Sequence, residues 1–254
     1  MKPNDTPFVR SDGRPFDQIR ELSIESGCSR NAEGSASIRT GNTWVRCTAT
    51  VEDRQPAFLR GTARGWVTAE YSMLPRSVDR RLARDKGQKR ANEIQRLIGR
   101  SLRIAVDLDK LNEHTITIDC DVIEADGGTR TAALTGAFVA LCEACRWLVR
   151  NGRIFHMPIQ TQVAGIAVGI VKGQVLCDLS YEEDSRAETD LNVFMTDTGR
   201  FIGIHGAAET ASFTHEELAA MLDSASSGLK PLFAAQRDAL GLPVDGLFNP
   251  EALL

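Results

Sequence analysis

Three clusters of side chains in this sequence are suited to binding or moving phosphate groups, and the first is rich in glycine. Gly127-Gly128-Thr129-Arg130 separates an alternating apolar segment from a long apolar one. A segment between a strand and a helix N-terminus presents unpaired N–H groups, and the helix dipole there favours an anion. Thr129 adds a hydroxyl donor, and Arg130 adds a planar guanidinium that matches two phosphate oxygens. The same residues also fit a helix cap with a surface arginine.

The second cluster is acidic and extends from Asp178 to Asp190. Its carboxylates are those of Asp178, Glu182, Glu183, Asp184, Glu188 and Asp190. Carboxylates gathered in one place suit Mg²⁺, a hard cation that takes oxygen ligands. They also suit general acid–base catalysis. A solvated acidic loop is the alternative reading of this segment.

The third cluster is basic. Residues 76–103 contain ten Lys or Arg and three Asp or Glu, a net charge of +7. The formal net charge of the whole chain is −4, so the remaining residues carry −11. This asymmetry predicts a local site for a polyanion, and the excess of arginine favours phosphate recognition, although a charged segment can simply be solvated. The only aromatic residues nearby are Trp66 and Tyr71, so base stacking is not an obvious mode of binding. The residues concerned are Arg76, Arg80, Arg81, Arg84, Lys86, Lys89 and Arg90.

Other reactive residues form no comparable cluster. Cys142 and Cys145 are two of six cysteines and form a CxxC motif in an apolar helical segment. Without a second pair they are a weak zinc signal, and buried reduced thiols fit better. The N-terminal residues contain no apolar signal region, and the longest apolar run, 163–171, is too short to cross a bilayer. We therefore expect a cytoplasmic protein with no membrane partner.

Two successive groups of elements are predicted to position these clusters. The first group contains a hairpin, a strand, a helix, a second strand and a long helix, at residues 35–39 with 44–51, 66–71, 92–102, 115–123 and 129–149. The second contains two hairpins and a helix that starts at a capping box, at residues 163–171 with 174–179, 192–195 with 201–205, and 214–240. Strands precede a helix in each group. The pattern predicts an α+β fold with two lobes, 10–150 and 151–240, within a single domain over residues 1–254.

Several motifs resemble the RNase PH family, and they occur in the order typical of that family. The resemblance covers residues from about 8 to 240. The matching segments are Arg10…Gly13-Arg14, Ala32-Glu-Gly-Ser35, Gly65-Trp-Val-Thr-Ala-Glu-Tyr71, Met73-Leu-Pro-Arg76, Glu93-Ile-Gln-Arg-Leu-Ile-Gly-Arg100, Asp119-Cys-Asp-Val122, Ala125-Asp-Gly-Gly-Thr-Arg-Thr-Ala132, Glu183-Asp-Ser185, Thr189-Asp-Leu-Asn-Val193 and Glu216-Glu-Leu218.

The resemblance implies a fold of duplicated β-α lobes that assembles into a homo-hexameric ring, a trimer of dimers. It also implies residue roles. Inorganic phosphate, the co-substrate, would be held by Arg90, Gly128, Thr129 and Arg130. Asp184 and Asp190 would be the catalytic aspartates and would bind Mg²⁺. RNA would be gripped by the basic segment, at Arg76, Arg80, Arg81, Arg84, Lys86 and Lys89.

The implied activity is a phosphate-dependent 3′→5′ exoribonuclease acting on RNA and not on DNA. It would trim the 3′ ends of transfer-RNA precursors, and ribosomal RNA as a further substrate, and release nucleoside diphosphates. Two alternatives belong to other functional classes. One is a catalytically inactive RNA-binding ring subunit, and the other is a Mg²⁺-dependent hydrolytic nuclease. The retained arginines and aspartates argue against the inactive subunit, and an anion site suited to free phosphate argues against the hydrolytic nuclease.

Overall fold

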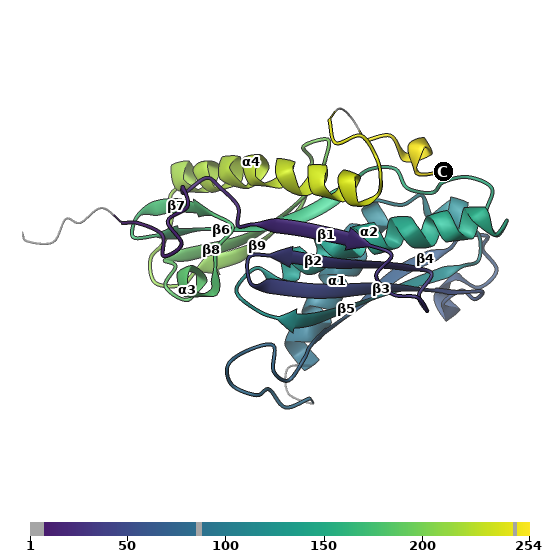
Figure 1. The fold of residues 1–254 in the computed structure, drawn as a ribbon, viewed down its shortest axis with the longest axis horizontal. Helices are drawn as coiled ribbons and strands as arrows, with labels where there is room; N and C mark the ends of the chain where they lie inside the picture. Colours follow the sequence, from purple (N-terminus) through teal and green to yellow (C-terminus); the bar gives the residue numbers. More distant parts are fainter. Residues whose placement is uncertain (1–7, 85–87, 246–247) are drawn as a thin grey trace, which may run out of the picture.

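The computed structural model describes residues 8–84, 88–245 and 248–254 (Figure 1). The described chain forms two β-sheets, four α-helices and three short 3₁₀ helices. The α-helices are α1 (Gln88–Ile104), α2 (Thr129–Arg150), α3 (Tyr181–Asp184) and α4 (His215–Ala239). The 3₁₀ helices are η1 (Ala57–Leu59), η2 (Leu108–Leu111) and η3 (Pro250–Leu253).

The first sheet has five strands in the order β1-β2-β3-β5-β4. These strands are β1 (Leu22–Ser26), β2 (Gly34–Thr40), β3 (Thr43–Glu52), β4 (Trp66–Met73) and β5 (Thr115–Glu124). The neighbours are antiparallel except for β4 and β5, which run parallel. A parallel pair needs a crossover connection, and α1 lies in that connection. This crossover places the N-terminal end of α1 near the end of β4.

The second sheet has four antiparallel strands in the order β7-β6-β8-β9. The strands are β6 (Val163–Val171), β7 (Gln174–Cys177), β8 (Thr189–Thr196) and β9 (Phe201–Ala208). Every residue of β6 is buried, because helices cover both of its faces. A strand covered on both faces is apolar along its whole length instead of alternating.

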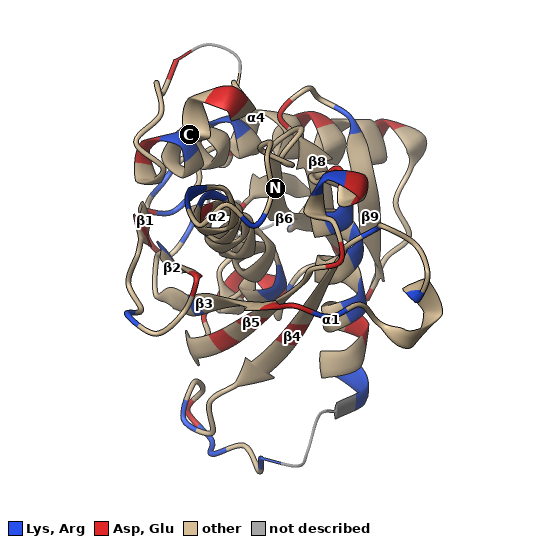
Figure 2. Ribbon diagram, turned by 90° about the vertical axis from the view of Figure 1, so that its right-hand side faces the viewer, with Lys and Arg blue, Asp and Glu red and all other residues tan. Residues whose placement is uncertain are grey.

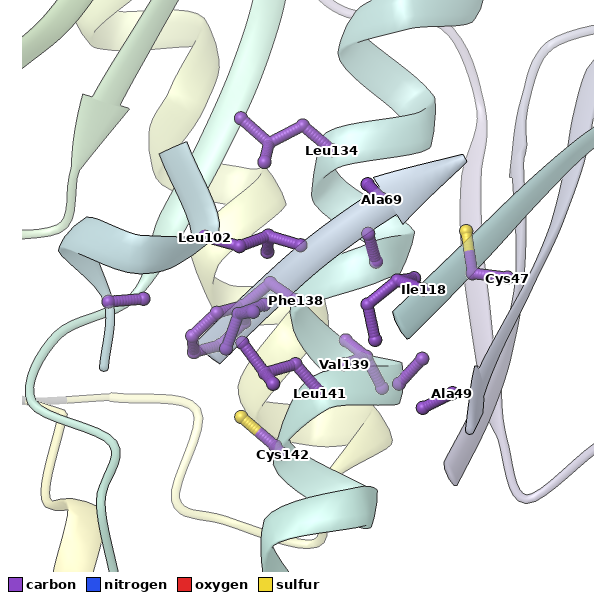
Figure 3. Packing of buried hydrophobic residues seen from close by; sticks show 14 of the residues in the cluster. Cys47, Ala49, Ala69, Leu102, Ile118, Leu134, Phe138, Val139, Leu141 and Cys142 are labelled. Carbon is purple, nitrogen blue, oxygen red and sulfur yellow. The ribbon is translucent and has the colours of Figure 1, made fainter. Parts of the chain in front are cut away.

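Helix α2 is the centre of the fold. It packs on β2, β3 and β5 of the first sheet and on β6 of the second. Figure 3 shows part of this core, where Leu134, Phe138 and Leu141 of α2 lie near Cys47 and Ile118 of the first sheet. Helix α4 covers the opposite face of the second sheet, with contacts to β6, β7 and β8. Both sheets are thereby held at fixed positions relative to the start of α2.

The predicted α+β fold and its main elements are confirmed. The hairpins, the long helices and the strand before α2 occur at the expected places within a few residues at each end. The edge strand β1, the three 3₁₀ helices and the four-residue helix α3 were not predicted. Helix α3 forms part of the acidic segment, for which a solvated loop was the alternative reading. Strand β8 begins at Thr189, so Asp190 lies inside a strand and not before it.

Helix α2 is also long and apolar enough, by length and composition, to cross a membrane. However, 78% of its apolar window is buried inside the protein, as the core helix of a folded domain must be. Cys142 and Cys145 lie in this helix and are buried. Burial raises the pKa of both thiols, so these cysteines are neutral parts of the core.

Candidate functional site

A pocket of about 850 Å³ brings together residues that are far apart in the sequence. Arg90 enters it from α1, Arg130 from α2, Asp184 from α3 and Asp190 from β8. The polar side chains and glycines that line the pocket are those of Asn42, Arg76, Ser77, Asp79, Arg80, Arg90, Glu124, Asp126, Gly127, Gly128, Thr129, Arg130, Tyr181, Asp184, Asp190 and Asn192. The four residues expected to carry the chemistry therefore face a single space.

The pocket contains the N-terminus of α2. Gly128 is the N-cap residue, has φ +66°, and provides no side-chain cap. The first amides of the helix are therefore directed toward the pocket without a side-chain partner at the cap. A Cβ atom on Gly127 would lie 2.5 Å from the carbonyl oxygen of Leu179. Only glycine permits this approach, which brings the α2 N-terminus against the segment leading into α3.

Tyr71 orients the hydroxyl of Thr129. The Tyr71 phenol is buried and donates a hydrogen bond to Thr129 Oγ1 at 2.8 Å. Burial raises the pKa of Tyr71, although this hydrogen bond and the charges of Arg90 and Arg130 oppose the rise. The phenol therefore remains a neutral donor. Since Thr129 accepts from Tyr71, its own proton is free to point into the pocket.

Asp184 and Asp190 are two of the carboxylates that line the pocket, which also contains Asp79, Glu124 and Asp126. Asp184 is exposed toward the pocket and Asp190 is half-buried. Loss of hydration raises the pKa of both groups. The positive charge of Arg130 opposes this rise in pKa at both aspartates. The negative charge of Asp184 raises the pKa of Asp190 further. Arg130 is therefore close enough to both carboxylates to affect their pKa, and Asp184 is close enough to affect that of Asp190.

Asp184 and Asp190 are the residues of the pocket that fit a Mg²⁺ ion. Among the described residues, no group of three or more His, Cys, Asp and Glu side chains could hold a metal. Mg²⁺ does not require such a group, because it is commonly held by one or two carboxylates together with substrate phosphates and water. Asp184 and Asp190, facing a site for phosphate, fit that requirement.

Helix α3 is held in place by an arginine from the N-terminal segment. Arg10 is 2% exposed and donates two hydrogen bonds of 2.7 Å to the carboxylate of Glu183. It also donates to the carbonyl oxygens of Cys177 and Asp178, at 2.9 and 3.1 Å. Glu183 completes a capping box with Ser180. Burial alone would raise the pKa of Glu183, but hydrogen bonds and the Arg10 charge lower it.

A second buried arginine, Arg20, connects the segment that precedes α2 to the segment that precedes α3. Arg20 donates to both carboxylate oxygens of Asp178, from its backbone N–H at 2.8 Å and from its guanidinium at 3.0 and 2.7 Å. The same guanidinium donates to the carbonyl oxygen of Asp126. Burial would raise the pKa of Asp178, and the hydrogen bonds and charge of Arg20 outweigh it and lower that pKa. Asp178 and Glu183 are therefore structural, and only part of the acidic cluster faces the pocket.

The basic segment divides into two parts. Arg76 and Arg80 line the pocket, together with Arg90. Arg81, Arg84 and Lys89 are exposed but do not line it, and Lys86 lies outside the described residues. Figure 2 shows the loop after β4, blue at its arginines, leading toward the start of α1. The basic surface therefore extends outward from the rim of the pocket.

Several pocket residues were not singled out from the sequence, among them Tyr181, Asp126 and Asn192. Tyr181 and Asp126 are joined by a hydrogen bond from the Tyr181 N–H to Asp126 Oδ1 at 3.1 Å. Asn192 lies two residues after Asp190 in β8, so both side chains face the same side of the sheet. The capping box at Ser180 and Glu183 was a usable signal for α3, because a serine followed by glutamate three residues later marks a helix start. No comparable signal marks Asn192.

The fold and the pocket define a class of protein: two sheets that share one core helix, with a pocket lined by arginines and carboxylates from both parts of the chain. Comparisons with known proteins agree. The family model described as "3′ exoribonuclease family, domain 1" matches residues 18–146. The model described as "3′ exoribonuclease family, domain 2" matches residues 161–228. These matches span most of the chain, which belongs to the 3′ exoribonuclease family of RNase PH.

Solved structures with a similar fold include exosome subunits. An archaeal exosome core chain superposes with a TM-score of 0.73 at 22% identity, covering 91% of each chain. A chain of the Archaeoglobus fulgidus exosome with RNA bound to the active site gives 0.74 at 22% identity, covering 88% of this chain and 91% of that one. Rice (Oryza sativa) Rrp46 gives 0.72 at 17% identity, covering 90% and 98%. At these identities the likeness concerns the fold.

Proposed function

We propose that this protein is a phosphate-dependent 3′→5′ exoribonuclease that releases nucleoside diphosphates. One observation carries the proposal: Arg90, Thr129 and Arg130 line the same pocket as Asp184 and Asp190, close enough for the charges of Arg90 and Arg130 to lower the pKa of Asp184 in part. A site of this kind can bind free phosphate on one side and the 3′-terminal phosphodiester of an RNA on the other. Membership of the 3′ exoribonuclease family supports RNA as the substrate.

The phosphate side of the pocket supplies the attacking group. Inorganic phosphate is held by the free amides of the α2 N-terminus, the Thr129 hydroxyl and the guanidinium groups of Arg90 and Arg130. A phosphate oxygen forms a bond to the phosphorus of the last phosphodiester. The bond from that phosphorus to the 3′-oxygen of the penultimate nucleotide breaks. The terminal nucleotide departs as a diphosphate, and the shortened RNA regains a 3′-hydroxyl.

Positioning and charge stabilisation account for most of the catalysis in such a transfer. Phosphate and phosphodiester are both anionic, so cationic groups must offset their repulsion. Arg90 and Arg130 do so from the protein, and Mg²⁺ held by one or both of Asp184 and Asp190 would supply further positive charge when bound. The raised pKa of these two aspartates also suits one of them to give a proton to the leaving 3′-oxygen.

The finer features of the proposal are the substrate and the assembly. Transfer-RNA precursors are the proposed substrate, with ribosomal RNA as a further one, and a homo-hexameric ring of three dimers is the proposed assembly. Both rest on the motifs shared with the RNase PH family. The exposed arginines around the pocket, among them Arg76 and Arg80, support a grip on an RNA backbone. Phosphate contacts of this type position an RNA without reading its sequence.

One assay distinguishes this function from its alternatives. A 3′-extended RNA is incubated with the protein and Mg²⁺, with and without inorganic phosphate, and the mononucleotide products are identified by chromatography. The proposal predicts nucleoside diphosphates, formed only when phosphate is present. Monophosphates formed without phosphate would identify a hydrolytic nuclease. Absence of turnover with retained RNA binding would identify an inactive ring subunit.

A further inference from the structure

Tyr181 is an aromatic side chain left exposed at the pocket. It is 66% exposed and lies among the residues that line the pocket. Among the described lining residues it is the only aromatic one. Trp66 and Tyr71, the aromatic residues noted near the basic segment, do not line this space: Tyr71 is 5% exposed, and Trp66 packs against Phe58 and Arg103.

The backbone of Tyr181 is fixed although its ring is exposed. Tyr181 is the first residue of α3, and its N–H donates to Asp126 Oδ1 at 3.1 Å. The capping box at Ser180 and the buried Arg10–Glu183 ion pair hold the same short helix. A large ring on a rigid backbone can contact a ligand at a small entropic cost, because only its own side-chain rotation is lost. The Tyr181 ring is therefore exposed on a fixed helix and not on a mobile loop.

The position of the ring relative to Asp184 suggests what it contacts. Tyr181 and Asp184 are three residues apart on α3, and helical residues at this spacing are surface neighbours with Cβ atoms about 5–6 Å apart. If the scissile phosphodiester lies at Asp184, the base of the adjoining nucleotide is within reach of the Tyr181 ring. Nucleic-acid bases stack on aromatic side chains regardless of sequence, because every base has a π-face.

We infer that the Tyr181 ring stacks on the base next to the scissile bond at the 3′ end of a single-stranded RNA. This inference rests on the proposed function and adds the element that holds the substrate base. Stacking of this kind would let an enzyme that removes nucleotides in succession bind each new terminal base, whatever its identity. The phosphate side of the pocket fixes the attacking group, and Tyr181 fixes the nucleotide that leaves.

The inference is tested with Tyr181→Ala and Tyr181→Phe, and with Phe155→Ala as a control because Phe155 is 84% exposed and does not line the pocket. Stacking of one base on an aromatic ring strengthens binding by about 5- to 150-fold. Tyr181→Ala should raise KM for RNA by that factor and leave KM for phosphate unchanged. Tyr181→Phe and Phe155→Ala should both behave like the unsubstituted protein, because stacking needs the ring and not the hydroxyl.

A spectroscopic test does not depend on turnover. An RNA with 2-aminopurine as its 3′-terminal base is titrated with protein without phosphate or Mg²⁺. Quenching is expected with the unsubstituted protein and Tyr181→Phe, and should be lost with Tyr181→Ala. Normal quenching and normal KM for RNA in Tyr181→Ala would overturn the inference, as would a changed oligomeric mass, which would place the ring in a subunit contact. Failure of the proposed function itself would instead appear as phosphate-independent products in the unsubstituted protein.

Discussion

Replacing Arg130 by alanine is predicted to weaken the use of phosphate far more than the use of RNA. Arg130 lies in the first turn of α2 and faces the pocket beside Thr129. In the proposed function its guanidinium donates to the attacking phosphate. A hydrogen bond to a charged group contributes about 1.5–3 kcal/mol, and each 1.4 kcal/mol is about tenfold. The KM for phosphate should therefore rise about 10- to 150-fold.

The same substitution should move the acidic limb of the pH profile. Burial raises the pKa of Asp184 and Asp190, and the charge of Arg130 lowers both in part. Without that charge both pKa values rise further, so the ionised carboxylates are lost at a higher pH as the solution is acidified. The acidic limb of kcat should shift to higher pH in Arg130→Ala. It should stay in place in Arg130→Lys, which keeps the charge and loses the planar fork.

Initial rates measured across a range of phosphate concentrations and pH test both effects on one set of proteins. Arg130→Lys is the matched control, and it separates the charge from the two-pronged geometry of the guanidinium. Circular dichroism and the melting temperature show whether each variant is folded. A folded Arg130→Ala protein with an unchanged KM for phosphate would refute the assignment of the phosphate site.

Three other perturbations test other parts of the site. Asp190→Asn should lower kcat by about 100- to 10,000-fold if the carboxylate carries acid–base or metal chemistry, with RNA binding retained in a gel-shift assay; near-normal kcat would exclude that role. Arg10→Met leaves the buried Glu183 carboxylate with only Arg14, at 3.4 Å, and the Ser180 N–H as partners, so the loss should reach at most the roughly 3–5 kcal/mol of a broken buried pair and calorimetry should show Tm lower by up to about 20 °C, whereas an unchanged Tm would mean that the Arg10–Glu183 pair contributes nothing. Replacing Arg80, Arg81 and Arg84 by alanine should reduce the salt-dependence slope of RNA binding by about 0.7–0.9 per lost phosphate contact; an unchanged slope would mean that this surface faces away from RNA.

Much of the fold could be predicted because its elements have local signals. The turn at Gly41-Asn42 and the alternation on both sides of it match the pairing of β2 with β3. The capping box at Thr214 marks the start of α4. Strand β1 was missed because it has five residues and only two apolar ones, Leu22 and Ile24. Its place depends on antiparallel pairing with β2, which is a tertiary contact.

The candidate site was less predictable than the fold, because its support comes from distant parts of the chain. Arg10 and Glu183 are 173 residues apart, and Arg20 and Asp178 are 158 apart. No periodicity links such pairs, so the acidic segment gave no sign that Asp178 and Glu183 are structural while Asp184 and Asp190 face the pocket. Helix α3 is too short for a periodic pattern. As a result, Tyr181 could not be placed at the pocket from spacing alone.

The central claim is that inorganic phosphate, bound at the start of α2, is the attacking group. It is tested most directly by supplying phosphate labelled with ³²P and following the label during digestion of an unlabelled RNA. We predict that the label is found in the β-phosphate of the released nucleoside diphosphates, one labelled phosphate for each nucleotide removed. Unlabelled nucleoside monophosphates as the products would contradict the account.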